Sequence, residues 1–524
     1  MHHVAPTHPS VIRKISRWLR KASEFDSSAP STGRPPSRLL EIKDEGAKVS
    51  LVTTSNRTTK YAALSHCWGS VRPMTLTKDS LGVLNEGVET SSLPQSFRDA
   101  VWLSGKLGAQ YLWIDSLCIL QDDLQDWTHE SARMRDVYEN SWVTIAASRA
   151  SCSAQGFLGE QDHFEYVSIP YQRGVVSGEI LAFTVPIDHA GNSDRRVYLD
   201  DEPLTTRGWA LQERCLSKRT LHFGRSQILF EHRGFVYTQD SCSPVPLHSY
   251  HPTTSISCQD WYSIVQHFSA RKLTKESDKL PALGALAAYF AENHFKGNDF
   301  AYLAGLWRQN MCEGLCWARD NHSPPRMRPQ SYRAPSWSWA SIDSQINHHN
   351  SGHNLAIVEN AHTRPVSLEN PFGEVREGWI RLRAMILRPY AKDERPGNNP
   401  PFWFCEQDID FYISVLWDAE PYHVPARGEA VERADGDEDL EFLPMCYYNT
   451  EGSSSNAIVG PFCLVVKKSN HTVAQYSDLK GYQRVGAGMA VPRRADDKDG
   501  LKKLVAGKWT EIMLAGQLED IILI

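Results

Sequence analysis

The chain is 524 residues long, and its 56 basic and 62 acidic side chains give a formal net charge of -6. This balance provides no basic surface of the kind that nucleic acids require, and the length favours two to four domains over a single core. No apolar stretch is long enough to cross a membrane and no apolar signal core is present, so we expect a cytoplasmic protein. The 11 cysteines have no regular spacing, which favours free thiols and gives no reason to expect a metal site.

The chain begins with a segment that is rich in Ser, Pro and His. We predict that residues 1–37 form a disordered tail. Within this segment, residues 11–21 form a short basic amphipathic patch that could contact a membrane surface or a partner. Such patches more often belong to flexible termini, so we prefer the tail. The first folded domain is predicted over residues 38–235.

Alternating strand and helix patterns follow. Residues 61–65 form an apolar run of strand length, and a helix is predicted over residues 94–108. A buried strand begins at Tyr111, a second helical pattern starts near the plausible N-cap Asp126, and residues 142–148 predict a third strand. Helices between strands require parallel pairing with right-handed crossovers. The sequence therefore predicts a doubly wound α/β unit.

Candidate site residues lie where two of these strands end. They are Ser65, His66, Trp68 and Gly69 after the first strand, and Asp115, Cys118, Gln121 and Asp122 in and after the central strand. Polar groups at the carboxyl ends of parallel strands are typical of ligand sites in open α/β folds. A buried, unpaired carboxylate is costly, so Asp115 is expected to have a partner or a function. A core strand with a capping turn explains the same pattern and is the more common structure.

Residues 152–201 are predicted to be an insertion with hairpin character, and a helix is predicted to follow. On this helix Glu213 comes four residues after Trp209, so both side chains share one face. Glu213 is therefore a candidate acid beside an aromatic wall. A salt bridge from Glu213 to Arg207 or Arg214 is an equally good interpretation of the spacing.

The remaining chain is predicted to contain a helical accessory region (236–345) and a mainly β C-terminal region (346–524). Amphipathic helices are expected at residues 259–270 and 280–290, and strands within residues 380–387, 411–416, 462–467 and 512–524. His348, His349 and His353 are interpreted as loop residues, with metal binding as the less favoured alternative. Residues 435–441 are expected to form a solvated acidic loop without the spacing of a calcium site.

Three blocks of the sequence resemble the heterokaryon-incompatibility (HET) domain of filamentous fungi. The blocks are residues 61–69, 111–138 and 207–214. Their order and spacing also match, and the resemblance covers roughly residues 61–223. Residues 334–340 resemble a stretch that often follows this domain. One position departs from the family, which usually has Asn where this chain has Leu120. If that Asn contacts a ligand, the contact is missing here.

The resemblance implies a role in nonself recognition and programmed cell death. HET domains are considered remotely similar to Toll/interleukin-1 receptor (TIR) domains, which are flavodoxin-like α/β units, some of which hydrolyse NAD. In the enzymatic TIR domains a glutamate follows a tryptophan by four residues on a helix, as Glu213 follows Trp209. The resemblance therefore implies Glu213 as the catalytic residue and NAD as a substrate, with no bound cofactor. The substrate would lie among the strand-end residues named above, together with Arg207 and Trp209.

Two other functions stay open. One is a non-catalytic module that acts by self-association or through an incompatibility partner protein, with Glu213 only structural. The other is a thiol enzyme that uses Cys118, or Cys67 with His66. The thiol enzyme is the weakest interpretation, because no third orienting residue is evident and because His66 and Cys67, as neighbours on a strand, point to opposite faces.

Overall fold

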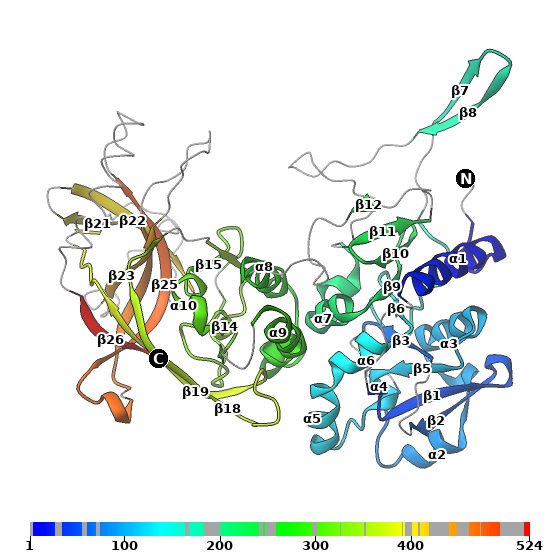
Figure 1. Ribbon diagram of the computed structural model, residues 1–524, viewed down its shortest axis with the longest axis horizontal. Helices are drawn as coiled ribbons and strands as arrows, with labels where there is room; N and C mark the ends of the chain where they lie inside the picture. The colour runs from blue at the N-terminus through cyan, green and yellow to red at the C-terminus, as the bar shows by residue number, and fades with distance from the viewer. Residues whose placement is uncertain are drawn as a thin grey trace, which may run out of the picture. The chain divides into compact units, whose positions relative to one another are not determined.

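A computed structural model divides the chain into two compact units, Met1–Ser255 and Ile256–Ile524 (Figure 1). It describes residues 4–26, 34–54, 60–69, 74–162, 167–182, 199, 201–239, 245–246, 258–295, 301–324, 326–349, 353–389, 391–392, 401–406, 409–418, 440–447, 461–471, 473–492 and 518–524. Within these ranges no helix has both the length and the apolar character to cross a membrane.

The described part of the first unit is built on one ten-stranded sheet, in the order β12-β11-β10-β9-β6-β3-β5-β1-β2-β4. Its strands are β1 (Arg38–Lys43), β2 (Lys48–Thr53), β3 (Tyr61–Ser65), β4 (Val88–Glu89), β5 (Tyr111–Ile114), β6 (Val143–Ala146), β9 (Arg219–Phe223), β10 (Ile228–His232), β11 (Phe235–Thr238) and β12 (Val245–Pro246). The central strands β9, β6, β3 and β5 pair in parallel, and antiparallel strands flank them on both sides. The first sheet therefore continues past residue 235, where we had placed the end of the domain.

Helices connect the parallel strands. The helices of this unit are α1 (Pro9–Asp26), α2 (Leu81–Glu86), α3 (Gln95–Leu107), α4 (Asp115–Cys118), α5 (Leu124–Ala132), α6 (Met134–Asn140) and α7 (Gly208–Leu216). The predicted order of strand, helix, strand, helix and strand is confirmed, with α3 between β3 and β5 and α4 to α6 between β5 and β6. Every residue of β3 and β6 is buried, as expected for strands covered on both faces. Gly108 ends α3 in the left-handed conformation, with a φ of 80°.

The N-terminal segment differs from the prediction, because residues 9–26 form α1 rather than a disordered tail. Val11, Ile15, Trp18, Leu19 and Ala22 lie on one face of this helix and are buried. Trp18 stacks on Phe230 of β10, with ring centroids 5.9 Å apart, and Figure 1 shows α1 beside β10 and α3. The apolar stripe is therefore covered by the sheet. Arg13, Arg17, Arg20 and Lys21 of the patch are exposed, whereas Lys14 is half-buried and donates to the carbonyl of Gln239.

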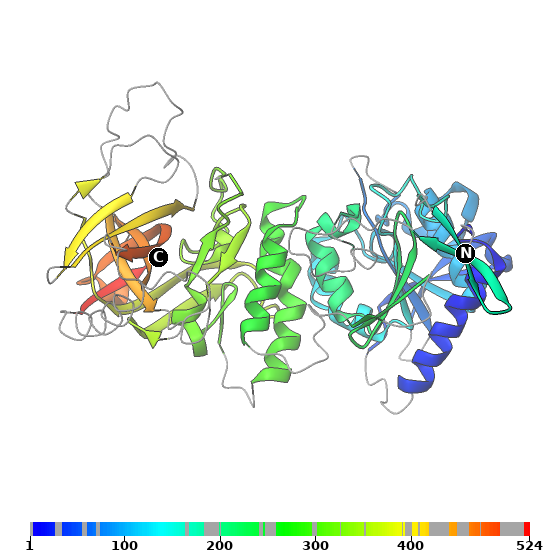
Figure 2. The same ribbon diagram turned by 90° about the horizontal axis from the view of Figure 1, so that it is seen from above.

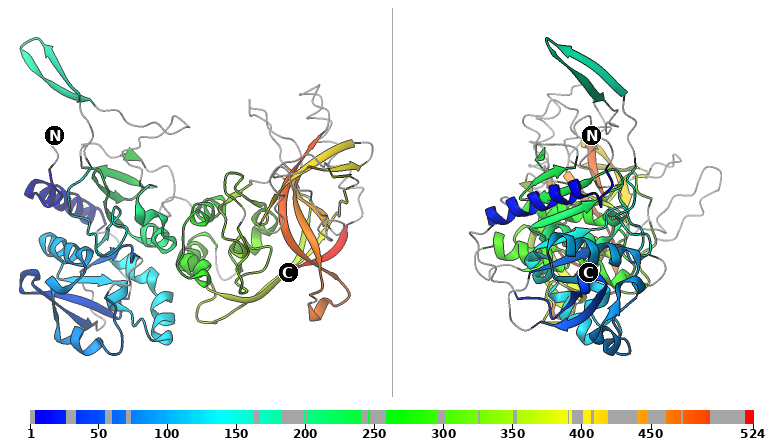
Figure 3. Two further views of the ribbon diagram at one scale, coloured as in Figure 1. Left: turned by 180° about the vertical axis from the view of Figure 1, so that it is seen from behind. Right: turned by 90° about the vertical axis from the view of Figure 1, so that its right-hand side faces the viewer.

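The insertion before α7 contains the predicted hairpin. Its strands, β7 (Val167–Arg173) and β8 (Val176–Ala182), pair antiparallel and form a two-stranded sheet of their own. Figure 3 shows this ribbon with no third strand beside it.

The second unit has short helices followed by many strands. Its helices are α8 (Cys258–Ser269), α9 (Pro281–His294) and α10 (Met311–Gly314), and Figure 2 shows α8 and α9 side by side. Its strands are β13 (Tyr302–Leu303), β14 (Leu306–Trp307), β15 (Trp317–Arg319), β16 (Ile346–His348), β17 (His353–Asn354), β18 (Ile357–Pro365), β19 (Val375–Ala384), β20 (Ala391–Lys392), β21 (Pro401–Glu406), β22 (Ile409–Trp417), β23 (Leu440–Tyr447), β24 (Pro461–Ser469), β25 (Lys480–Pro492) and β26 (Glu519–Leu523). Strands β17 to β26 join into one described sheet.

Both helices predicted in this unit are confirmed, and strands lie in all four predicted segments, although residues 512–517 are outside the described residues. The loop prediction was wrong for His348, which lies on β16, and for His353, which lies on β17, whereas His349 lies outside any strand as predicted. The His348 ring stacks on Tyr262 with centroids 3.9 Å apart. Among the described residues, no three His, Cys, Asp or Glu side chains cluster as metal ligands would. Of the predicted acidic loop, residues 435–439 lie outside the described residues, and Glu441 is a buried residue of β23.

Candidate functional site

The predicted site residues meet where the parallel strands end. Strand β3 pairs with β5 on one side and with β6 on the other. The chain passes from β3 to β5 and then returns to the opposite side of β3, which makes the carboxyl end of β3 a point where the strand order reverses. Ser65 is the last residue of β3, Asp115 directly follows β5, and Glu213 reaches this edge from α7.

Glu213 lies at the centre of these contacts and is only 1% exposed. The hydroxyl of Ser65 donates a hydrogen bond to its carboxylate, and Tyr138 of α6 forms a second side-chain hydrogen bond with it. Burial raises the pKa of Glu213, while Arg207 and the two hydroxyl groups act in the opposite direction. The carboxyl group is therefore fixed in orientation before any ligand arrives.

Arg207 joins the two carboxylates of the site. Its guanidinium lies 3.6 Å from Oε1 of Glu213 and 3.3 Å from Oδ2 of Asp115, and it also donates to the backbone carbonyl of His66. Glu213 therefore forms one of the two predicted salt bridges, the one with Arg207. Arg214, the other candidate, pairs with Glu231 at 2.8 Å instead.

Asp115 has the partners that its burial requires. The indole Nε1 of Trp68 donates to Oδ2 at 2.9 Å, and the backbone N–H of Ser116 donates to Oδ1 at 2.7 Å. The side chain of Asp115 is 13% exposed and that of Arg207 is 22% exposed, whereas Glu213 is almost fully covered. Asp115, Arg207 and Trp68 therefore form the accessible side of the cluster. Trp209 is half-buried on the first turn of α7.

His66 lies behind the cluster rather than in its accessible side. Its ring is fully buried, packs edge-on against Phe97, and has no hydrogen-bond partner on either nitrogen among the described residues. The nearest carboxylate oxygen, on Asp115, is 3.8 Å away. Burial lowers the pKa of His66 to about 4, so the ring is neutral at neutral pH and is a poor general base there.

The two thiols of the alternative enzyme are unsuited to nucleophilic attack. Burial raises the pKa of Cys118 to about 12 and that of Cys67 to about 11. The thiolate is the reactive form of cysteine, and these pKa values leave almost none of it at neutral pH. The burial of Cys118 and the partial burial of Cys67 therefore disfavour the thiol enzyme.

Gln121 and Asp122 bind backbone groups, and one of these is the carbonyl of Asp115, to which the Gln121 side-chain amide donates at 3.3 Å. The side-chain amide of Gln121 donates to the carbonyl of Ile119 at 3.1 Å, and Asp122 accepts from the backbone N–H of Lys78. Both residues fix the loop that follows Asp115.

One protein-family model matches the part of the chain that contains this cluster. Residues 61–213 match the family model described as heterokaryon incompatibility protein (HET). The chain contains a HET domain. No curated protein and no solved structure gave a match. The matched region begins at the first residue of β3 and ends at Glu213, so it includes Ser65, Asp115 and Arg207.

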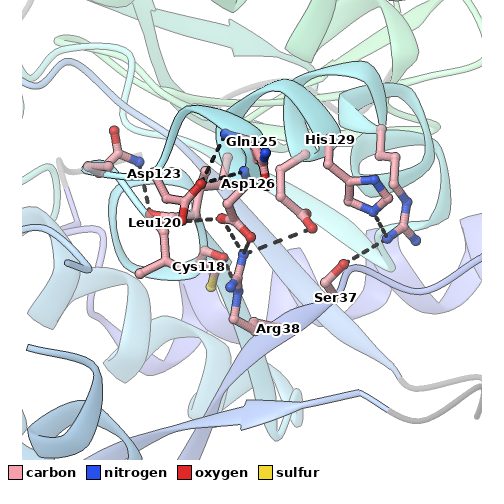
Figure 4. Close-up of polar contacts among 12 residues, drawn as sticks. Ser37, Arg38, Cys118, Leu120, Asp123, Gln125, Asp126 and His129 are labelled. Atoms are coloured by element: carbon pink, nitrogen blue, oxygen red, sulfur yellow. Dashed lines mark hydrogen bonds and ion pairs between the residues drawn. The ribbon is translucent and has the colours of Figure 1, made fainter. Parts of the chain in front are cut away.

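Arg38 of β1 supports this HET site from outside the matched region and was not predicted from the sequence. It donates to the carbonyl of Cys118 at 2.8 Å and pairs with Asp126 at 2.6 Å, and Asp126 in turn accepts from the backbone N–H of Leu120 (Figure 4). Asp123, not Asp126 as predicted, caps α5. The loop after Asp115 is therefore held at Cys118 by Arg38 and at Leu120 by Asp126. Leu120 is the residue that stands where the resemblance leads one to expect Asn.

Tyr138 is the second residue of the HET site that sequence reasoning missed. Its place on the apolar face of a predicted helix favoured a simple core residue. The phenolic hydroxyl was the one available signal, since a buried tyrosine usually finds a hydrogen-bond partner.

Gly69 is required where β3 leads out of the HET site. Its φ is +87°, and an added Cβ would lie 2.3 Å from Cβ of Cys152. We expect Gly69→Ala to lower the free energy of unfolding by about 2 kcal/mol or more, through backbone strain and this clash. Urea unfolding would measure the change. Gly105→Ala on α3 is the control, because nothing lies near its added Cβ, and it should be neutral or stabilising. Equal effects of the two changes would contradict the prediction.

Proposed function

We propose that the HET domain acts in heterokaryon incompatibility by cleaving NAD, with Glu213 as the catalytic carboxylate. This proposal rests on one observation: Arg207 pairs with both Glu213 and Asp115 at the edge where neighbouring parallel strands end. Open α/β sheets bind ligands at this edge. The activity would serve nonself recognition in the cytoplasm of a fungal cell and would lead to programmed cell death.

The proposed reaction breaks the bond between the nicotinamide nitrogen and C1 of the ribose. Nicotinamide leaves as a neutral molecule with the bonding electrons, so no strong general acid is needed. Water captures the ribosyl cation and releases a proton to solvent. A carboxylate beside C1 would stabilise the developing positive charge. Arg207 and Ser65 support this role of Glu213, because both favour the ionised form of a carboxyl group whose pKa burial raises.

The strand order supports a flavodoxin-like, and hence TIR-like, arrangement. Numbered along the chain, the parallel strands β3, β5, β6 and β9 are first to fourth, and they lie in the sheet in the order second, first, third, fourth. Flavodoxin-like sheets begin with the same order, and their ligands bind where the first strand neighbours the third. In this chain that position is the edge between β3 and β6, where Ser65 lies.

A second function is favoured by one specific observation. Glu213 is almost fully buried and paired with an arginine, which is also how a purely structural carboxylate is accommodated. The HET domain would then be a non-catalytic module that acts by self-association or with an incompatibility partner protein.

The deciding experiment is to measure cellular NAD after induced expression of the wild-type chain and of Glu213→Gln. We expect early loss of NAD, followed by death, with the wild-type chain alone. Equal killing by both proteins at equal abundance, without loss of NAD, would contradict NAD cleavage and favour the interaction module.

A further inference from the structure

The β7–β8 hairpin has one apolar face and one mainly polar face. Cross-strand partners such as Ile169 and Ile180, or Arg173 and Val176, lie on the same face of the ribbon. The face to which these pairs belong carries Val167, Ile169, Tyr171, Val176 and Ile180. The opposite face carries Ser168, Pro170, Gln172, Ser177 and Glu179, together with Leu181, which pairs with Ser168. Such alternation is typical of a strand pair that covers something apolar.

No described residue covers the apolar face. Its five large side chains are between 41% and 66% exposed, and the two strands belong to no larger sheet. An isolated two-stranded hairpin is only marginally stable in water and needs a further strand or a packed layer. The ring of Tyr171 lies against Gly178 of the neighbouring strand, where there is no side chain, and so covers both strands on this face.

The charges of the hairpin indicate what kind of surface fits it. Arg173, beside the turn, is the one charged residue on the apolar face, and with Glu179 on the other face the hairpin has no net charge. A charged partner would lose hydration without gaining a counter-charge, so an uncharged apolar surface is the better complement. Within the described residues, this hairpin holds more exposed large apolar side chains than any other segment of similar length. The complement that the chain itself provides is therefore the same face of a second copy.

We propose that the apolar face of the β7–β8 hairpin is a self-association surface, on which the same face of a second copy packs as a second layer. A two-fold axis would relate the two hairpins, so that each contributes the same residues. Packing by the face is favoured over edge pairing through β7, because Pro170 has no N–H to donate. The proposal does not depend on NAD cleavage.

The size of the face sets the strength of the contact. Strands of seven residues give a ribbon roughly 24 Å long and 10 Å wide, so two packed faces bury on the order of 500 Å². Stable interfaces bury about 1,200 Å² or more in total. The association is therefore weak and depends on the protein concentration.

Sedimentation of the purified full chain from about 1 µM to 1 mM tests the proposal. The wild-type chain should change from monomer to dimer within this range. Ile169→Lys places a charge in the apolar face and should weaken dimerisation at least about tenfold, whereas Ser168→Lys changes the charge equally on the polar face and should dimerise as the wild type does. A wild-type chain that stays monomeric, or an Ile169→Lys variant that dimerises equally well, would overturn the proposal.

Hydrogen exchange of the hairpin amides gives a second, independent readout. Protection of residues 167–182 should rise with protein concentration in the wild type and not in Ile169→Lys. Strong protection that is the same at every concentration would mean that the hairpin is covered by its own chain, and the proposal would be wrong. Both variants lie outside the main sheet, so their thermal unfolding should match that of the wild type.

Discussion

Glu213→Gln should reduce the rate of NAD cleavage by about 10²–10³-fold while the HET domain stays folded. Glutamine has nearly the same shape as glutamate and can still accept the hydrogen bond from Ser65, so the cluster keeps its geometry. It has no charge with which to stabilise a ribosyl cation. The loss should therefore appear mainly in kcat and less in KM, because the interaction is made chiefly in the transition state.

Release of nicotinamide by the purified chain would measure this effect. Glu231→Gln is the matched control: Glu231 is also a buried glutamate paired with an arginine, and it lies on β10 away from the cluster. A rate that falls equally in both variants would indicate a general structural effect. Full activity in a folded Glu213→Gln protein would remove Glu213 from the mechanism.

Asp418→Ala should lower the free energy of unfolding of the second unit by about 3–5 kcal/mol. Asp418 and Arg484 are both fully buried, with 2.9 Å between the carboxylate and the guanidinium. Arg484 also donates to the carbonyls of Leu315 and Trp317 and lies over the ring of Trp317. Removal of the carboxylate would leave a guanidinium that cannot lose its proton inside the core.

Urea unfolding followed by tryptophan fluorescence would measure this change. The control is Glu377→Ala, which breaks an equally close pair with Arg364 on the surface, where both side chains are 57% exposed. The control should change stability by no more than about 1 kcal/mol. Similar effects of the two variants would show that the buried pair has no special importance. Replacement of both buried partners by apolar residues should recover part of the loss.

The parallel core of the first unit was predictable because its signals are local. Strands that are buried on both faces must be continuous apolar runs, and the runs at β3, β5 and β6 are separated by helical patterns. The same logic placed Ser65 and Asp115 at one edge of the sheet, because parallel strands end on the same side. Glu213 could be added from its spacing to Trp209 and from the family resemblance, and Arg207 as a possible salt-bridge partner of Glu213.

The remaining features depend on contacts between distant parts of the chain. Arg38 and Asp126 are 88 positions apart, and nothing at either position predicts the other. The apolar stripe of α1 was visible in the sequence, but the sheet that covers it was not, so a tail was the better expectation. Asp123 and Asp126 are both acceptable caps, and Arg38 decides between them by binding Asp126.

The position of α1 has a practical consequence for any shortened form of this protein. A HET domain cut to begin at β1 would fit the family match, but it would uncover Phe230 and Tyr237, whose rings lie against Trp18. It would also leave Arg219 and His232 without the Asp26 carboxylate that they now share. Truncation at that boundary should therefore give a fragment that aggregates and is poorly expressed. Affinity tags should therefore be fused ahead of α1 and should not replace it. Proteolytic removal of α1 in the cell would likewise expose the rings of Phe230 and Tyr237.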